Sequence, residues 1–509
     1  MTAVSTAKKY NLLDFIVYGF ILAWVINYRK HVLLNFGFIY TDSDQNLMWE
    51  GLKDYAEGHF YEPRYYGQGY NTFLEALFAV PLYRYGLAPY VALPIVTTVL
   101  SIFPFVIISF FTLIKRSPFY AFVIVSIPLM LPIEYAMITT LPRGFVTGVF
   151  VASIGCIAMF YETRKWAFFL AGLFAMLAYT VNSNGVLLSA PCLLYLFLLN
   201  YKNSAFYKFI TPGILLGAAV HFFMQRFYTL HPSYNLHHID LEYKFEFISG
   251  GLTMLDKFLN YNMPVFHSHG YFALLIFLLV GCYFLWKKDY AKSITVFSIP
   301  VLFVLTLGLN KVYDGIDSLF FPFSRMYLAI PVLLGLCMSL FDPPIRPYIV
   351  YLWILVPLSW RDSQLVKIKE TVAEKVKPSD HEVVIITKNE WILRDCKYLS
   401  KICSDHHVDL FVVANHYYLN AYTYGCVSCV DSFPKTLMPS FDRRTWRLLE
   451  DEKTVYKTVM FVDMDNKIGI GHPLLEKIPG TVDLYLAKNN TLKTLQLLDT
   501  LGIKYRKFR

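Results

Sequence analysis

Charged residues are scarce in this chain, at 16% of its 509 positions, against roughly 25% in ordinary soluble domains. Hydrophobic residues make up 56% and aromatic residues 17% of the sequence, and the mean hydropathy is +0.43. This composition excludes a typical soluble globular protein. We therefore expect most of the chain to lie in lipid.

Other common signals are also missing. No Gly-rich phosphate loop follows a strand-like run, since Gly469-Ile-Gly471 lacks the rest of the fingerprint, so nucleotide binding is not predicted. We find no internal repeat and no low-complexity segment. No small-residue cleavage site follows the first hydrophobic run, so we expect residues 12–28 to remain as a helix. The net charge of +9 comes from short Lys and Arg clusters between hydrophobic runs, which does not suggest nucleic-acid binding.

Apolar runs long enough to approach the thickness of a bilayer recur up to Trp360 and then stop. They predict an α-helical polytopic membrane domain over residues 1–363, with about eleven transmembrane helices. The expected spans are 12–28, 90–114, 119–131, 145–160, 166–181, 185–199, 209–224, 271–286, 292–309, 326–341 and 348–360.

Basic residues fall mainly on alternate loops, and the positive-inside rule assigns those loops to the cytoplasm. The first acidic loop, the loop 226–270 and the C-terminal tail then face the periplasm, lumen or exterior. We expect an integral membrane protein, for example one of the bacterial inner membrane, with these segments on the outer side. Arg29 and Lys30 are exceptions, because the same scheme places them outside.

After Trp360, charged residues become frequent and short apolar strand-like runs alternate with helix-like runs. We expect a soluble α/β domain over residues 364–509, built on a parallel sheet covered on both faces. This domain holds Cys396, Cys403, Cys426 and Cys429. On the outer side these predict one or two disulfides, whereas in the cytoplasm they would predict a zinc site or a redox pair.

Two carboxylates follow the first hydrophobic run, at Asp42 and Asp44. A helix is expected over residues 43–58, with Asp42 as its N-cap paired with Gln45 and with Gly58 as its stop. On such a helix Asp44 would point about 200° away from Asp42, so we expect the two acids not to share one function. We favour Asp44 as a catalytic base, although an acid in a first turn also complements the helix dipole.

A family resemblance rests on Asp44-Gln45, Gly58, Tyr66-Gly67-Gln68-Gly69-Tyr70, Leu74-Glu75-Ala76 and Pro81. This run resembles the first outer loop of bacterial GT-C-type membrane glycosyltransferases, a superfamily that includes the protein O-mannosyltransferases and the lipid A aminoarabinose transferase. Arg325-Met-Tyr-Leu-Ala-Ile-Pro331 resembles a second family pattern more weakly.

The resemblance implies inverting transfer of a sugar from a polyprenyl-phosphate donor to an extracytoplasmic glycan, lipid or protein. Asp44 would be the base, and Tyr66, Gln68, Tyr70 and Glu75 the substrate-binding candidates. Gln45 departs from the family pattern, in which an acid often follows the Asp, so a role for that second acid is not carried over.

The chemistry of such a transfer also needs cations to hold the leaving phosphate, and Arg325 and Arg143 are the candidates. Either could instead anchor the chain at the membrane interface. No cofactor is required. A divalent metal is an option at His231, His237, His238, Asp240, His267 and His269, although their spacing matches no ligand motif. The rival hypotheses are a transporter or flippase of lipid-linked glycans and a non-catalytic scaffold.

Overall fold

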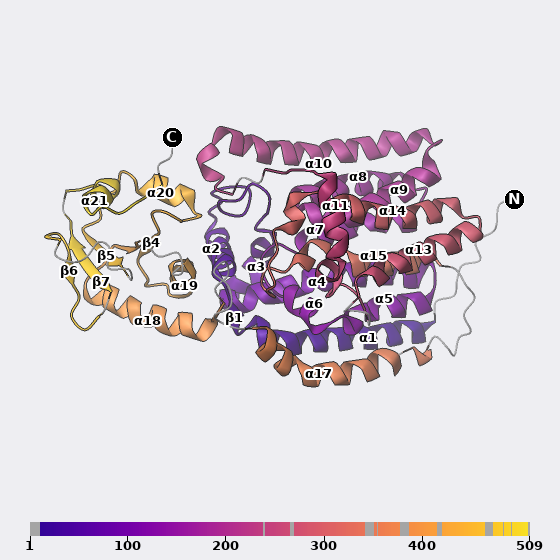
Figure 1. Cartoon of the computed structure of the whole chain (residues 1–509), viewed down its shortest axis with the longest axis horizontal. Helices are drawn as coiled ribbons and strands as arrows, with labels where there is room; N and C mark the ends of the chain where they lie inside the picture. The colour runs from indigo at the N-terminus through magenta and orange to yellow at the C-terminus, as the bar shows by residue number, and fades with distance from the viewer. Residues whose placement is uncertain are drawn as a thin grey trace.

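The computed structural model describes residues 11–237, 240–264, 269–341, 351–353, 355–376, 386–414, 420–463, 472–481, 483–489 and 491–506. Figure 1 shows a large assembly of helices with a smaller domain of helices and short strands at one end. The smaller domain lies beside α2 and β1, which follow the first long helix of the chain. The N-terminal end of the chain lies at the far side of the helical assembly.

The helical assembly contains α1 (Leu12–Val32), α2 (Ser43–Glu57), α3 (Leu74–Arg84), α4 (Pro89–Lys115), α5 (Pro118–Met130), α6 (Ile133–Ile138), α7 (Thr147–Cys156), α8 (Lys165–Val181), α9 (Val186–Asn200), α10 (Ser204–Leu230), α11 (Phe245–Thr253), α12 (Leu255–Leu259), α13 (Tyr271–Trp286), α14 (Tyr290–Thr306), α15 (Ile330–Ser339) and α17 (Leu355–Lys375). A π-helical turn, η1 (Leu33–Gly37), extends α1, and the 3₁₀ turns η5 (Asn310–Tyr313) and η6 (Phe323–Tyr327) precede α15.

Four helical segments are long and apolar enough to cross a membrane: 12–37, 89–115, 183–200 and 204–230. Six shorter apolar helices coincide with six further expected spans. These helices are shorter than a full span; α5, with 13 residues, would reach only about 20 Å at 1.5 Å per residue. The structure thus supports a helical membrane protein with four candidate spans. The expected run 348–360 lies partly outside the described residues.

The two basic exceptions of the loop-charge scheme, Arg29 and Lys30, are not in a loop, because α1 continues beyond residue 28. Arg29 is buried and donates to the hydroxyl groups of Thr139, at 2.9 Å, and Ser101, at 3.0 Å. Its charge is therefore placed by contacts between helices and carries no information about loop orientation.

The C-terminal domain has one sheet with strand order β4-β3-β5-β7-β6. The strands are β3 (Leu410–Val413), β4 (Lys435–Leu437), β5 (Thr458–Val462), β6 (Glu476–Lys477) and β7 (Leu484–Lys488). Strands β4, β3 and β5 are parallel, joined by α19 (Asn420–Cys429) and α20 (Thr445–Asp451), whereas β7 and β6 pair antiparallel. The prediction of a wholly parallel sheet is therefore wrong at β7, which is antiparallel to both of its neighbours, β5 and β6. No helix is described between β5 and β7, so a parallel crossover has no covering element there.

Helices cover both faces of this sheet, as expected. Alternate residues of β3 and β5 point to opposite sides, so Phe411 and Met460 pack with residues of α18 (Asn389–Asp405) and α19. Val412 and Phe461 pack with residues of α20 and α21 (Thr494–Thr500) on the other side. The apolar strands are thus buried on both faces.

A disulfide joins Cys396 of α18 to Cys426 of α19, while Cys403 and Cys429 are free. The sequence predicted one or two disulfides in this domain for an outward-facing tail. The observed bridge links two helices and does not join Cys426 to Cys429, which form a Cys-x-x-Cys motif. The bridge therefore fixes α19, the helix that packs against α2, to the helix before it.

The described residues near the boundary between the helical assembly and the C-terminal domain form helix α17 and strand β2. Helix α17 runs through the expected boundary at 363/364. Strand β2 (Thr387–Lys388) pairs antiparallel with β1 (Tyr40–Thr41), immediately before α2. The Asn389 backbone N–H also donates to the carbonyl of Ile39 at 2.8 Å. These contacts hold the start of the C-terminal domain beside the loop that carries Asp42 and Asp44.

Candidate functional site

Helix α2 places Asp44 in its first turn, and both ends of this helix are as the sequence predicted. The Asp42 side chain accepts the backbone N–H of Gln45 at 2.9 Å, as an N-cap does. Gly58 ends the helix with a φ of 86°, in the left-handed region that favours glycine.

Both oxygens of the Asp44 carboxylate are engaged by arginines. Arg143, in the loop between α6 and α7, donates to Oδ2, and Arg443, in the loop between β4 and α20, donates to Oδ1 at 2.5 Å. Arg143 also lies 3.2 Å from Oδ2 of Asp42. The prediction that Asp42 and Asp44 do not share a function assumed that their side chains point in opposite directions, and that assumption is wrong because both contact Arg143. Asp42 has extended backbone outside the helix, so helical periodicity does not separate the two side chains.

The two acids have opposite electrostatic environments. Burial raises the pKa of Asp44, but the guanidinium groups of Arg443 and Arg143 outweigh it, so the pKa lies well below its usual range. Burial also raises the pKa of Asp42, and there Arg143 offsets it only in part, leaving the pKa above its usual value. Asp44 is thus the acid that stays ionised.

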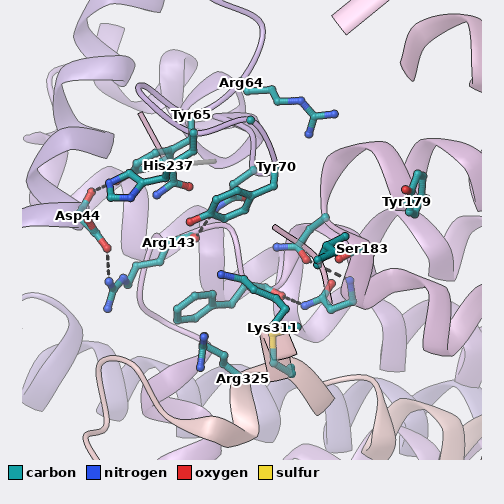
Figure 2. Close-up of a pocket in the computed structure, with 18 of the residues that line it drawn as sticks. Asp44, Arg64, Tyr65, Tyr70, Arg143, Tyr179, Ser183, His237, Lys311 and Arg325 are labelled. Carbon is teal, nitrogen blue, oxygen red and sulfur yellow. Dashed lines mark hydrogen bonds and ion pairs between the residues drawn. The ribbon is translucent and has the colours of Figure 1, made fainter. Parts of the chain in front are cut away.

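A cavity of about 330 Å³ opens beside Asp44 (Figure 2). Five of the residues predicted from the sequence line it: Asp44, Gln68, Tyr70, Arg143 and Arg325. They come from four separate stretches of the chain. The fold therefore gathers the predicted acid and the predicted phosphate-binding cations at one place.

Three other predicted residues do not line this cavity and instead support it. Asp42 caps α2 and pairs with Arg143. Tyr66 is fully buried and its hydroxyl donates to Oδ2 of Asp54 at 2.6 Å. Glu75 accepts the backbone N–H of Gly144 at 2.6 Å, next to Arg143. Tyr66 and Glu75 contact neighbouring protein groups and do not line the cavity, and substrate binding by them stays a prediction.

Cations in the cavity exceed its carboxylates. Arg325 is buried, and its guanidinium donates to the carbonyls of Pro322 and Asp314, each at 2.9 Å, while lying 3.8 Å from the ring centroid of Phe321. Within the described residues it forms no ion pair. Lys311 pairs with the Asp314 carboxylate at 2.9 Å, and its amine lies 4.7 Å from the ring centroid of Tyr70.

Several lining residues escaped the sequence analysis. Arg64 and Lys311 lie in the cavity wall, as does Asn182-Ser183-Asn184. The last group had a visible signal, because three polar residues separate two apolar runs. Arg443 had no local signal, since 399 positions separate it from Asp44.

The histidines considered for a metal site do not gather around the cavity in the described structure. His237 lines it, and burial lowers the pKa of this imidazole to about 4, which Arg443 reinforces, so the ring is neutral at pH 7. His238 and His267 lie outside the described residues. Among those described, a group with metal-like spacing is Asp54, Glu57 and His59, which does not line the cavity.

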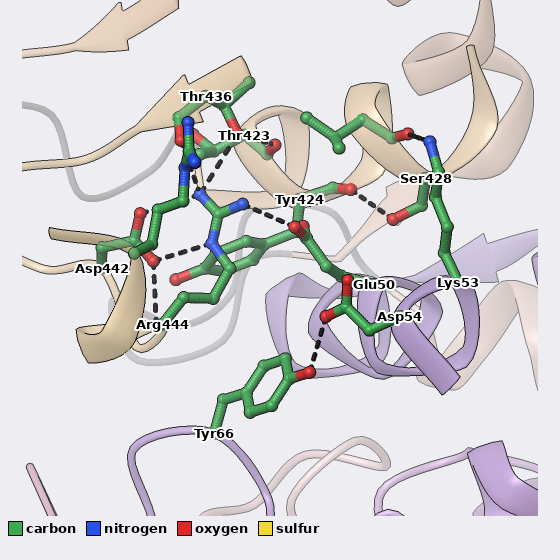
Figure 3. Close-up of polar contacts among 12 residues, drawn as sticks. Glu50, Lys53, Asp54, Tyr66, Thr423, Tyr424, Ser428, Thr436, Asp442 and Arg444 are labelled. Atoms are coloured by element: carbon green, nitrogen blue, oxygen red, sulfur yellow. Dashed lines mark hydrogen bonds and ion pairs between the residues drawn. The ribbon is translucent and has the colours of Figure 1, made fainter. Parts of the chain in front are cut away.

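The neighbouring Arg444 anchors the C-terminal domain to α2 (Figure 3). It is 1% exposed and donates to the carboxylates of Glu50, at 2.6 Å, and Asp442, at 2.8 Å. The carbonyl oxygen of Arg443 also lies 3.0 Å from where a Cβ on Gly67 would stand, and Gly67 has a φ of 71°. Arg443 and Arg444 are therefore held against α2 and the following loop by close packing as well as by charge.

Loss of the Arg444 charge should loosen this contact. In Arg444→Met, the buried carboxylates of Glu50 and Asp442 lose their counter-charge, which typically costs about 3–5 kcal/mol. We expect a clearly lower melting temperature of the purified full-length protein in detergent. Arg394→Met is the control, because Arg394 pairs with Asp395 at the surface with its side chain 72% exposed, and it should melt like wild type. Equal melting temperatures for both variants would contradict the anchoring role.

Glu75 should make stability depend on pH. Burial raises its pKa from 4.5 to about 8, although the N–H of Gly144 and the hydroxyl of Thr97 partly offset this. A raised folded pKa contributes stability below the unfolded pKa that is lost as pH rises through about 8. The melting temperature of Glu75→Gln, relative to wild type, should therefore increase between pH 5 and pH 9. A constant difference across this range would mean that Glu75 does not take up a proton on folding.

No protein-family model matches the chain, and no match is found among curated proteins or solved structures. The interpretation of the site therefore rests on the residues, contacts and charges given above.

Proposed function

We propose that this protein is a membrane glycosyltransferase that moves a sugar from a polyprenyl-phosphate donor to an extracytoplasmic acceptor. The observation that carries the proposal is the cavity itself: one ionised carboxylate, Asp44, faces the same space as Arg143, Lys311 and Arg325. A carboxylate to orient the acceptor hydroxyl and cations to hold a leaving phosphate are what such a transfer needs.

The donor phosphate is assigned to Arg325 and Lys311. A buried guanidinium without an ion pair is costly, so a phosphate at this position would supply the missing negative charge. Arg143 forms ion pairs with Asp42 and Asp44 and also lines the same cavity. A bound phosphate would therefore compete with Asp44 for Arg143.

This competition bears on the role of Asp44 as a base. With two arginines the carboxylate holds a proton weakly, and a phosphate that attracts Arg143 would bring the pKa of Asp44 back toward its ordinary value. The acceptor oxygen then attacks C1 of the sugar as its proton passes to Asp44. The bond from C1 to the phosphate oxygen breaks, and its electron pair leaves with the polyprenyl phosphate, so the configuration at C1 inverts.

The rest of the cavity suits a carbohydrate. Side chains with amide groups line it at Gln68, Asn71, Asn182, Asn184 and Gln225, and an amide can both donate to and accept from sugar hydroxyl groups. The rings of Tyr65, Tyr70 and Tyr179 lie in the same wall. A purely hydrophobic lipid ligand would form no hydrogen bonds with these amide groups.

An outward-facing site is part of the proposal. The loop charges favour it, and the bridge between Cys396 and Cys426 supports it, because disulfides persist in oxidising compartments such as the periplasm. A polyprenyl-linked donor flipped across the inner membrane would be consumed on that side. The acceptor is a glycan, a lipid or a protein.

Removal of the Asp44 charge should greatly slow sugar transfer. We expect Asp44→Asn to lower the rate of sugar transfer by roughly 10²–10⁴, the usual contribution of a general base. The assay is transfer of labelled sugar from polyprenyl phosphate in membranes that lack the native protein.

Asp42→Asn is the matched comparison for Asp44→Asn. Asn remains a good N-cap, so this change removes one ion pair to Arg143 and keeps the helix start, and we expect a much smaller loss. The reverse order of activities would transfer the base role to Asp42. A transporter of lipid-linked glycans would move labelled lipid across the bilayer in both variants and form no transfer product.

Arg325 should be sensitive even to a change that retains its charge. Lysine lacks the planar fork that binds phosphate with two parallel hydrogen bonds, so Arg325→Lys should raise the KM for the donor several-fold and more than it lowers kcat. Kinetics at varied donor concentration would measure this split. Unchanged kinetics in Arg325→Ala would place the donor phosphate elsewhere in the cavity.

A further inference from the structure

Arg64 is a second buried arginine in the cavity lining. Its side chain lies in the loop between α2 and α3 and is 2% exposed. One guanidinium nitrogen, Nη1, donates to the carbonyl of Thr180 at 3.1 Å, and Nε has no hydrogen-bond partner. Within the described residues no carboxylate forms an ion pair with it. Burial lowers the pKa of Arg64, yet a guanidinium remains charged at neutral pH.

The surroundings of Arg64 differ from those of the proposed donor site. Figure 2 shows Arg64 and Arg325 on opposite sides of Tyr70. The cavity also contains Tyr179 of α8 and His221 of α10, whose ring centroids lie 5.2 Å apart. Nδ1 of His221 is buried without a hydrogen-bond partner. Among the residues that the structure describes, the part of the cavity bordered by α8 and α10 therefore holds a cation without an ion pair and an imidazole nitrogen without a hydrogen-bond partner.

A structural role alone does not account for Arg64. A single hydrogen bond to a carbonyl near the end of α8 does not offset the free-energy cost of burying a full charge. Arg29 shows the alternative, because its guanidinium is also buried but donates to Thr139 and Ser101 and lies outside the cavity lining. The difference points to a ligand that completes the Arg64 environment.

We propose that Arg64 forms a second oxyanion subsite, which binds a phosphate or carboxylate group carried by the acceptor. This inference rests on the proposed transferase function, since it gives the donor phosphate to Arg325. With both subsites filled, donor and acceptor would each be held by a charge, on opposite sides of Tyr70. The acceptor is thereby restricted to anionic molecules.

The position of α10 indicates how such an acceptor could be attached. Within an 18-residue apolar stretch of α10, only 22% is buried inside the protein. Phe222 and Phe223, beside His221, are 62% and 69% exposed. An oxyanion bound at Arg64 is thus close to a helix with an apolar outer face. A lipid headgroup and a soluble anionic group share the required chemistry, and the experiment separates them.

The test measures binding rather than transfer, so that its failure is distinct from failure of the proposed function. Full-length protein carrying Arg325→Met, which weakens the donor subsite, is titrated with inorganic phosphate while its melting temperature is followed. Adding Arg64→Met should raise the apparent Kd for phosphate on the order of tenfold or more, the usual effect of losing a hydrogen-bonded charged partner. Adding Arg29→Met instead should leave the Kd unchanged.

Stability without ligand gives a second, opposite readout. Burying a charge without a compensating partner costs free energy, and an apolar side chain of similar size does not carry that cost. Arg64→Met alone should therefore melt at or above the wild-type temperature in the absence of phosphate, because only one hydrogen bond is lost. Arg29→Met should melt lower, because three hydrogen bonds to Thr139 and Ser101 are lost. A lower melting temperature for Arg64→Met, together with an unchanged phosphate Kd, would overturn the subsite and make Arg64 structural.

Dihexanoyl phosphatidic acid, used as a second probe, identifies the source of the oxyanion. If this lipid binds more tightly than inorganic phosphate and the difference is lost in Arg64→Met, the subsite binds a lipid headgroup. If the two probes bind equally, the subsite binds a soluble group. Failure of both probes to distinguish Arg64→Met from its parent would refute the subsite. If Asp44→Asn transferred sugar normally while the Arg64 effect persisted, the transferase proposal would fail and the subsite would stand.

Discussion

The contact of two adjacent arginines with one short helix is the constraint on which the site depends. Arg443 and Arg444 reach α2 from the C-terminal domain, one to Asp44 and the other to Glu50. Each side of this interface carries buried charge that the other side neutralises. The C-terminal domain is therefore part of the site, because the ionised state and the orientation of Asp44 both require it.

Charge is unevenly distributed across the site. At the interface, acids on α2 and arginines from two other segments neutralise one another, so this region needs no ligand. In the cavity, Arg64 and Arg325 are buried, and the hydrogen-bond acceptors that the described residues offer them are backbone carbonyl groups. The arginines without an ion pair thus lie in the cavity, and the paired arginines lie at the interface. This distribution of charge supports the proposal that the cavity binds anionic molecules.

Local features of the site were predictable from sequence, and distant ones were not. The N-cap at Asp42 and the stop at Gly58 follow from side-chain chemistry within one helix, and most apolar runs became helices. Arg443 was missed because a pairing across the length of the chain leaves no local pattern. The separation of Asp42 from Asp44 was wrong since it assumed helical geometry for a residue that precedes the helix. The bounds of the apolar runs were predicted closely, but most of the runs form helices shorter than a candidate span, so four candidate spans stand where eleven were expected.

The sequence distance between Asp44 and Arg443 has a consequence for biogenesis. Asp44 emerges from the ribosome early, whereas its partner follows 399 positions later. Throughout insertion of the helices the carboxylate has no Arg443 beside it, and the domain that supplies this arginine also contains a disulfide between α18 and α19. The complete site is therefore a late product of synthesis, and a chain truncated before residue 443 would retain the cavity-lining helices without the mature electrostatic state of Asp44.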